Sequence, residues 1–160
     1  MGGQLNLAKQ VPGKEEFHGL VAWFVHETRR LGVETRLGAM VDVADLAGFD
    51  QVIVASGVSP RDPQIPGQER AKSYLQVLHG APIGRRVAIV GAGGIGFDVA
   101  EYLVANGHSV TLNPVEWRKE WGVGDPAETA GGLREPAPEP PAREVWLLQR
   151  KAEKPGRNLG

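Results

Sequence analysis

The glycine-rich loop at residues 91–96 constrains the fold more than any other feature of the sequence. Between an apolar segment and a helical pattern it places, in order, Gly91, Ala92, Gly93, Gly94, Ile95 and Gly96. This is the spacing G-x-G-x-x-G, in which the first glycine allows a tight turn, the second lets the backbone approach a pyrophosphate, and the third lets the helix pack on the strand. The amino terminus of the helix then offers unpaired N–H groups to phosphates. The sequence therefore predicts dinucleotide binding here, and the alternative is a glycine-rich turn without a ligand.

The choice of dinucleotide depends on the residues that follow the second strand. An NAD site is typical where a carboxylate stands there, about 20 residues past the loop, because it binds the ribose 2′-hydroxyl. The next extended piece, residues 109–112, is followed by Asn113, which carries no carboxylate. If residues 114–143 are an insertion, the second strand is 145–148, and its end carries Arg150, Lys151 and Lys154. Cations at that place fit a 2′-phosphate, so we expect NADP(H); the alternative is a solvated basic stretch.

The rest of the chain predicts an α/β fold with two Rossmann-like nucleotide-binding lobes, both incomplete, and a parallel sheet. We expect one lobe at 1–82 and the other at 83–160, meeting near residues 82–84. Strands 87–90 and 145–148 should pair in parallel within one sheet. The insertion holds four prolines between Pro136 and Pro141, and this tract should be exposed and irregular because proline cannot donate to a ladder or continue a helix. Periodicity and turn residues predict the other elements: helices at 17–31, 73–78 and 97–105, an edge strand at 33–37, and a strand at 49–56 buried on both faces.

Composition excludes several classes of site. The chain has no cysteine, so disulfides, zinc–thiolate centres and cysteine-bound iron–sulfur clusters cannot form within it. A net charge of −1 gives no reason to expect nucleic acid as a partner, and no apolar run is long enough to span a bilayer, so a cytoplasmic protein is expected. The four histidines are scattered, and we expect neither a metal site nor catalytic residues. In hydride transfer the cofactor carries the chemistry. Trp117 and Trp121, one helical turn apart, are expected to cover the core.

Four segments together resemble a known family. They are residues 2–17 (GGQLNLAKQVPGKEEF), 54–57 (VASG) with Pro60-Arg61, 91–98 (GAGGIGFD), and 148–151 (LQRK) with 154–156 (KPG). They closely resemble the FAD- and NADPH-binding region of bacterial NADPH-dependent 2,4-dienoyl-CoA reductases, in the group of old-yellow-enzyme-like NADH:flavin oxidoreductases and trimethylamine dehydrogenase. The resemblance covers essentially the whole chain, including the insertion.

The resemblance implies a longer enzyme of which this chain is a fragment. In that family a barrel holds FMN and the substrate beside a 4Fe–4S cluster, and electrons pass from NADPH to FAD, through the cluster to FMN, and then to the dienoyl-CoA. The resemblance implies that the lobe at 1–82 is a partial FAD-binding lobe and the lobe at 83–160 the NADP(H)-binding Rossmann lobe. The barrel, the cluster's cysteines and the first glycine loop of the FAD-binding lobe are absent here, so we expect the isolated chain to be inactive toward dienoyl-CoA. Arg150 and Lys154 would bind the 2′-phosphate of NADPH. The residues implied along FAD are Gly3, Gln4, Leu5, Ala55, Ser56 and Gly57.

Three other functions remain open from the sequence. The chain could be a non-catalytic nucleotide-binding module, or part of another flavin amine dehydrogenase of the same architecture. It could also belong to a methyltransferase whose glycine loop binds S-adenosylmethionine, although the cations after strand 145–148 argue against that.

Overall fold

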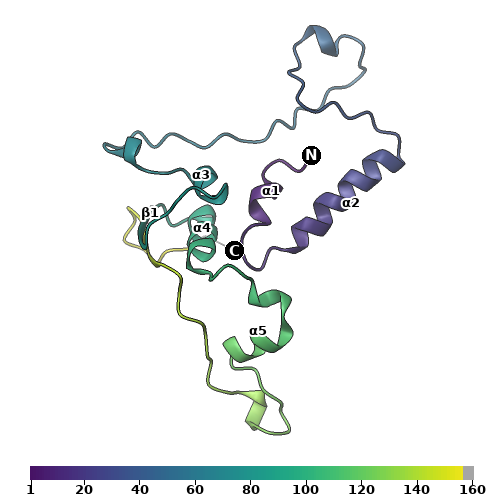
Figure 1. Ribbon diagram of the computed structural model, residues 1–160. Coiled ribbons are helices and arrows are strands. Elements are labelled where there is room, and N and C mark those ends of the chain that lie inside the picture. Colours follow the sequence, from purple (N-terminus) through teal and green to yellow (C-terminus); the bar gives the residue numbers. More distant parts are fainter. Residues whose placement is uncertain (157–160) are drawn as a thin grey trace.

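The computed structural model describes residues 1–156 as a small α/β body with two long excursions (Figure 1). The body contains α3, α4 and the strands, with α1 and α2 beside it; one excursion is the loop of residues 33–72, and the other is the arm of residues 114–143 that begins with α5. The elements in chain order are α1 (Leu5–Ala8), α2 (Glu16–Arg30), α3 (Tyr74–Leu78), β1 (Arg86–Val90), α4 (Gly94–Val104), α5 (Pro114–Glu120) and β2 (Glu144–Leu148), with 3₁₀ turns at Ala44–Leu46, Gln68–Arg70, Val110–Leu112 and Ala130–Gly132.

The sheet is a parallel pair of strands on which α4 packs. β1 and β2 pair in the register Arg86↔Glu144 through Val90↔Leu148. This confirms the predicted parallel pairing of 87–90 with 145–148, and the α/β fold class. Parallel strands require a crossover connection, and here α4 and the whole arm lie within that connection.

Two small apolar clusters meet at α3. One contains Leu7, Val11 and Leu78, and the other contains Val77, Val99 and Leu103, against which the inward side chains of the sheet pack. The start of α3 is fixed by a capping box in which the Gln76 N–H donates to Ser73 Oγ (3.3 Å) and the Ser73 N–H donates to Gln76 Oε1 (2.8 Å). Because neighbouring residues of α3 enter different clusters, this helix joins the N-terminal segment to the sheet. The lobe boundary at residues 82–84 stays a prediction.

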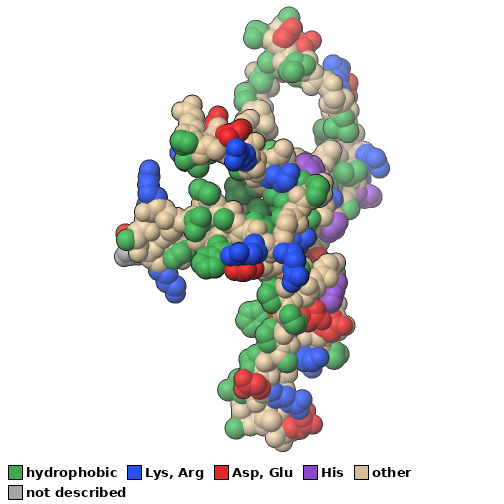
Figure 2. All heavy atoms as spheres, turned by 60° about the vertical axis from the view of Figure 1, so that its left-hand side comes forward, with side chains coloured by type: hydrophobic (Ala, Val, Ile, Leu, Met, Phe, Trp, Pro, Cys, Tyr) green, Lys and Arg blue, Asp and Glu red, His purple; other side chains and the backbone are tan. Residues whose placement is uncertain are grey.

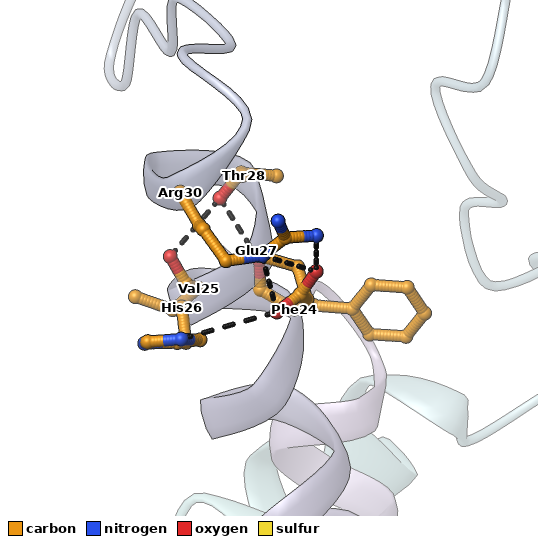
Figure 3. A network of polar contacts seen from close by, with 6 residues as sticks. All are labelled: Phe24, Val25, His26, Glu27, Thr28 and Arg30. Carbon is orange, nitrogen blue, oxygen red and sulfur yellow. Dashed lines mark hydrogen bonds and ion pairs between the residues drawn. The ribbon is translucent and has the colours of Figure 1, made fainter.

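The predicted helices form, at slightly shifted bounds. Residues 17–31 correspond to α2, 73–78 to α3 and 97–105 to α4, which begins at Gly94 within the glycine loop. α2 buries none of its residues, although its apolar spacing favoured burial. Contacts within the helix support it instead: Arg30 donates two hydrogen bonds to Glu27 Oε2, and Thr28 Oγ1 donates to the carbonyl oxygens of Phe24 and Val25 (Figure 3).

The strand expected at 49–56 is wrong within this chain. These residues adopt no regular structure and are exposed, with Ile53 90% and Val54 84% accessible. A strand buried on both faces needs neighbouring strands and covering layers, and the loop of residues 33–72 instead runs out from the body (Figure 1). Hydrophobic side chains are therefore visible on the surface of this loop in Figure 2.

Three smaller predictions are also wrong, each for a local reason. Residues 33–37 have no strand partner and form no edge strand. The piece at 109–112 is not extended, because Val110–Leu112 form a 3₁₀ turn that leads directly into α5. Trp117 and Trp121 do not cover the core: they stack on each other with ring centroids 6.0 Å apart and remain 37% and 62% exposed on the arm.

The proline tract is exposed and without regular structure, as predicted. One bond ties it to α5, from the Ala137 N–H to the Lys119 carbonyl oxygen (3.1 Å). Within residues 1–156, none of the helices combines the length and the apolar character that crossing a membrane requires.

We predict that Leu103→Ala lowers the free energy of unfolding by about 2 kcal/mol or more, because Leu103 is 2% exposed and truncation leaves a cavity in a small core. Chemical denaturation followed by circular dichroism measures the change. The matched control is Leu37→Ala, at a leucine that is 72% exposed, which should change stability by less than about 0.5 kcal/mol. Equal effects of the two substitutions would contradict the core described here.

Candidate functional site

The glycine loop lies where the two strands end. Gly91 directly follows β1 and has φ of +122°, a left-handed conformation that favours glycine. Its N–H donates a hydrogen bond of 2.8 Å to the carbonyl oxygen of Leu148, the last residue of β2. The loop is therefore attached to the carboxyl edge of the sheet, where open α/β sheets bind their ligands.

The three glycines of the motif have different roles in the geometry. A Cβ at Gly96 would overlap the carbonyl oxygen of Gly91 and lie 3.6 Å from Leu147 Cδ2. A Cβ at Gly93 would meet nothing within 4 Å. Gly96 is thus required by the packing of α4 on the sheet, whereas the fold itself places no such demand on Gly93.

Gly93 is also the N-cap residue of α4, directly before Gly94. It caps the helix without a side chain, so no side-chain oxygen competes for the N–H groups of the first turn. Space in front of Gly93 and unpaired donors behind it are the two features that a pyrophosphate requires. The intervening Gly94 and Ile95 are exposed, and Ala92 is half-buried.

The basic residues follow β2 beside this loop. Arg150, Lys151 and Lys154 are all exposed. The turn that carries them is organised by Gln149, whose Nε2 donates to the carbonyl oxygens of Lys151 (2.9 Å) and Glu153. Because Leu148 bonds to Gly91, Arg150 follows by two residues a strand end that touches the glycine loop. The structure therefore brings the two parts of the predicted NADP(H) site to one edge of the sheet.

Asn113 lies away from the glycine loop, and its side chain caps α5. Its Oδ1 accepts hydrogen bonds from the N–H groups of Val115 (3.1 Å) and Glu116 (3.4 Å), so it caps α5. It lines an open cavity of about 1270 Å³ together with Ile83 and Arg143, which precede β1 and β2. Asn113 is thus at the amino edge of the sheet, opposite the glycine loop, and is not placed to hold a ribose there.

The two segments expected along FAD also approach each other. Gln4 Nε2 donates a 3.1 Å hydrogen bond to the carbonyl oxygen of Val58, the residue after Gly57. Gly3 and Gly57 both have positive φ, at +45° and +77°. Gly3, Gln4 and Leu5 therefore lie near Ala55, Ser56 and Gly57, although the latter three belong to an exposed loop. Binding of FAD at these residues stays a prediction.

A further group of polar residues joins the segment before α2 to α4 and to the turn that follows α4. The sequence analysis did not identify this group. Lys14 Nζ forms an ion pair of 2.6 Å with Asp98 Oδ2 on α4, and each side chain is 34% exposed. The adjacent Glu15 accepts a hydrogen bond of 2.9 Å from Thr111 Oγ1. We refer to Lys14, Glu15, Asp98 and Thr111 as the clamp. The paired residues of the clamp are far apart in the chain, so no local sequence pattern predicts their contacts.

The carboxylates near the clamp have shifted pKa values. For Glu15, partial desolvation raises the pKa, but hydrogen bonds from Ser109, Gly13 and Thr111 outweigh it, and the net pKa is lowered. For Glu101, partial desolvation and the negative charges of Asp98 and Glu15 raise the pKa, with Lys14 opposing them. Glu101 is therefore a carboxylate whose charged form the folded chain disfavours.

We predict that Glu101→Gln raises the thermal unfolding midpoint at about pH 7. A carboxyl with a raised folded pKa costs no stability below its ordinary pKa of 4.5, and the cost grows to its full value as pH rises through the folded pKa. The gain should therefore vanish below the ordinary pKa. Thermal unfolding of both proteins, followed by circular dichroism from below pH 4.5 to about pH 7, tests this prediction. The control is Glu69→Gln, at an exposed position of the loop of residues 33–72, which should leave the midpoint unchanged. A less stable Glu101→Gln variant at about pH 7 would contradict the assignment.

Comparison with known proteins agrees with this arrangement. Residues 24–118, which include the glycine loop, match the family described as pyridine nucleotide-disulphide oxidoreductase. The chain is 32% identical over 121 residues to an NADH oxidase of Thermoanaerobacter brockii, covering 70% of this chain and 19% of that protein. It is 33% identical over 115 residues to a metal reductase of Desulforamulus reducens (66% of this chain, 17% of the relative), and 33% identical over 110 residues to a cinnamate reductase of Clostridium sporogenes (64% and 16%).

The chain spans less than a fifth of the length of these relatives. What it shares with them is a domain that serves flavin-dependent oxidoreductases, and such a domain implies binding of FAD and a pyridine nucleotide. The fold is consistent with the family match: a parallel strand pair carries the glycine loop at its carboxyl edge, within the matched residues. The chain belongs to the pyridine nucleotide-disulphide oxidoreductase family.

Proposed function

We propose that this chain is the cofactor-binding part of a flavin-dependent NADPH oxidoreductase, in which it brings NADPH and FAD together for hydride transfer. The observation that supports this best is the hydrogen bond from the Gly91 N–H to the Leu148 carbonyl oxygen. It joins the loop suited to a pyrophosphate to the turn that carries Arg150 and Lys154. NADPH supplies the hydride and FAD accepts it, so the chain's own residues need only bind and orient the two cofactors.

Each group of residues has a role in this proposal. Gly93 and the first turn of α4 hold the pyrophosphate of NADPH. Arg150 and Lys154, with Lys151 beside them, hold its 2′-phosphate through charge-assisted hydrogen bonds. The segments at residues 3–5 and 55–57 lie along FAD, and the Gln4–Val58 bond keeps them together.

For the full-length enzyme we propose 2,4-dienoyl-CoA reduction. Support comes from the resemblance of residues 2–17 and 148–156, which are more specific than the glycine loop. The chain has no cysteine to ligate a 4Fe–4S cluster, so the cluster, FMN and the dienoyl-CoA site belong to the part of the enzyme outside these 160 residues. Small-molecule cofactors are then this chain's partners, and the cytoplasm is the proposed location.

We predict that Gly93→Ala weakens NADPH binding about tenfold or more, equivalent to about 1.4 kcal/mol or more, and leaves the unfolding midpoint unchanged. The added methyl group meets no protein atom within 4 Å but enters the space of the pyrophosphate. Calorimetric titration with NADPH and thermal unfolding give the two readouts.

The same titration separates the roles of the glycines. Gly84→Ala, also at a position with open space and no positive φ, should change neither readout. Gly96→Ala should lower the unfolding midpoint, because its methyl group collides with the backbone at Gly91. Unchanged NADPH affinity in Gly93→Ala would mean that the loop is a turn without a ligand.

We predict that Arg150→Ala weakens NADPH binding by about tenfold and leaves NADH binding nearly unchanged, because NADH lacks the 2′-phosphate. Arg118→Ala, at an exposed arginine on α5, is the control and should alter neither affinity. Titrations with both nucleotides provide the measurement. An equal loss of affinity for NADPH and NADH would show that Arg150 supports the fold. No loss of affinity for either nucleotide would show that the basic turn is a solvated surface that does not bind the cofactor.

A further inference from the structure

The clamp meets α4 close to the glycine loop. Asp98, the partner of Lys14, follows Gly96 by two residues on the same helix. The second contact, from Thr111 to Glu15, comes from the turn that follows α4. The segment that precedes α2 is therefore fastened both to the helix that opens with the loop and to the turn beyond its far end.

The other side of the clamp is continuous with the segment expected along FAD. Hydrogen bonds run without interruption from the Lys14 N–H to the Val11 carbonyl oxygen (3.1 Å), from Val11 to Ala8 (3.0 Å), and from Ala8 to Gln4 (3.0 Å). Val11 is only 1% exposed and packs with Leu7 against α3. A displacement at Lys14 is thus transmitted through a short, well-packed segment to Gln4.

Lys14 stands among carboxylates. Asp98 pairs with it directly, Glu15 precedes α2 beside it, and Glu101 lies one turn further along α4, where the charges of Asp98, Lys14 and Glu15 all act on it. Removing the charge of Lys14 would leave the Glu15 carboxylate near the Asp98 and Glu101 carboxylates of α4, with no cation to offset them. Like charges at such separations repel, so the two segments should move apart.

We propose that Lys14 and Asp98 form a positioning pair that sets the spacing between the flavin segment and the glycine loop. This inference rests on the proposed function, because it assigns FAD to residues 3–5 and NADPH to residues 91–96. The proposed reaction moves one hydride from NADPH to FAD, and a solvent proton completes the reduced flavin. Transfer of this kind depends steeply on the separation of the reacting atoms, so a displacement of about 1 Å can cost about a hundredfold in rate.

The spacing can be measured without any cofactor. The chain has no cysteine, so Gln10→Cys, in the segment between Gln4 and Lys14, and Ala88→Cys on β1, which leads into the glycine loop, both at exposed positions, allow two spin labels to be attached selectively. Pulsed electron–electron double resonance should give a narrow distribution of label-to-label distances in the otherwise unchanged chain. In the Lys14→Met background the distribution should broaden and move to longer distances, and Lys14→Arg should restore it.

The matched control is Arg30→Met, which breaks the ion pair of 2.7 Å with Glu27 inside α2 (Figure 3). That pair connects residues of one helix, so its loss should leave the distance distribution unchanged. If Lys14→Met fails to fold, Asp98→Asn removes the same ion pair with a smaller change in side-chain shape. An unchanged distribution in the folded Lys14 or Asp98 variant overturns the inference.

Rapid mixing of the FAD-loaded full-length enzyme with NADPH gives the functional readout. Lys14→Met should slow flavin reduction about tenfold or more, with NADPH affinity unchanged. If Lys14 had only a structural role, Lys14→Met would lower the unfolding midpoint and would reduce the rate of flavin reduction and the NADPH affinity together. Such a joint loss would contradict the positioning role. If the full-length enzyme binds neither FAD nor NADPH, the proposed function fails, and the distance measurement still decides the positioning role.

Discussion

The parallel pairing of β1 with β2 is the constraint on which the rest of the structure depends. This ladder joins the strands at the two ends of the long crossover, and its last step continues into the bond between the Gly91 N–H and the Leu148 carbonyl oxygen. Because parallel strands end at the same edge, the glycine loop and the basic turn must lie side by side. The arm between them can be long without disturbing this edge, since it leaves the body after α4 and returns at β2 (Figure 1).

A small core makes polar contacts between segments important. The two apolar clusters contain three buried residues each, and α3 is shared between them. This packing holds α1, α3, α4 and the sheet together but does not extend to α2, which buries no residue. The clamp adds an ion pair and a hydrogen bond to a carboxylate where α2 begins. These contacts hold a region to which the apolar clusters do not extend.

Local patterns predicted the elements whose causes are local. The glycine spacing indicated a strand, a turn and a helix in order, and β1 and α4 follow it closely. Recognition of residues 114–143 as an insertion then gave the correct partner strand. The strand expected at 49–56 failed because burial of an apolar run depends on neighbours that this chain does not place beside it. Pairing of Lys14 with Asp98 had no local cause at all, since 84 positions separate the two residues.

The glycine loop and the basic turn also differ in what they specify. The family match ends at residue 118, within α5 and before β2. The shared region therefore contains the glycine loop proposed to hold the pyrophosphate, which NADH and NADPH have in common, whereas the residues proposed to distinguish NADPH from NADH follow the insertion. In a continuous strand–loop–helix–strand unit the second strand follows the helix directly. Here Asn113 occupies that point in the sequence but caps α5 at the opposite edge. In the proposed site, the position that distinguishes NADPH from NADH is then Arg150, beyond the arm, and the register of the strand pair places the end of β2 next to the glycine loop.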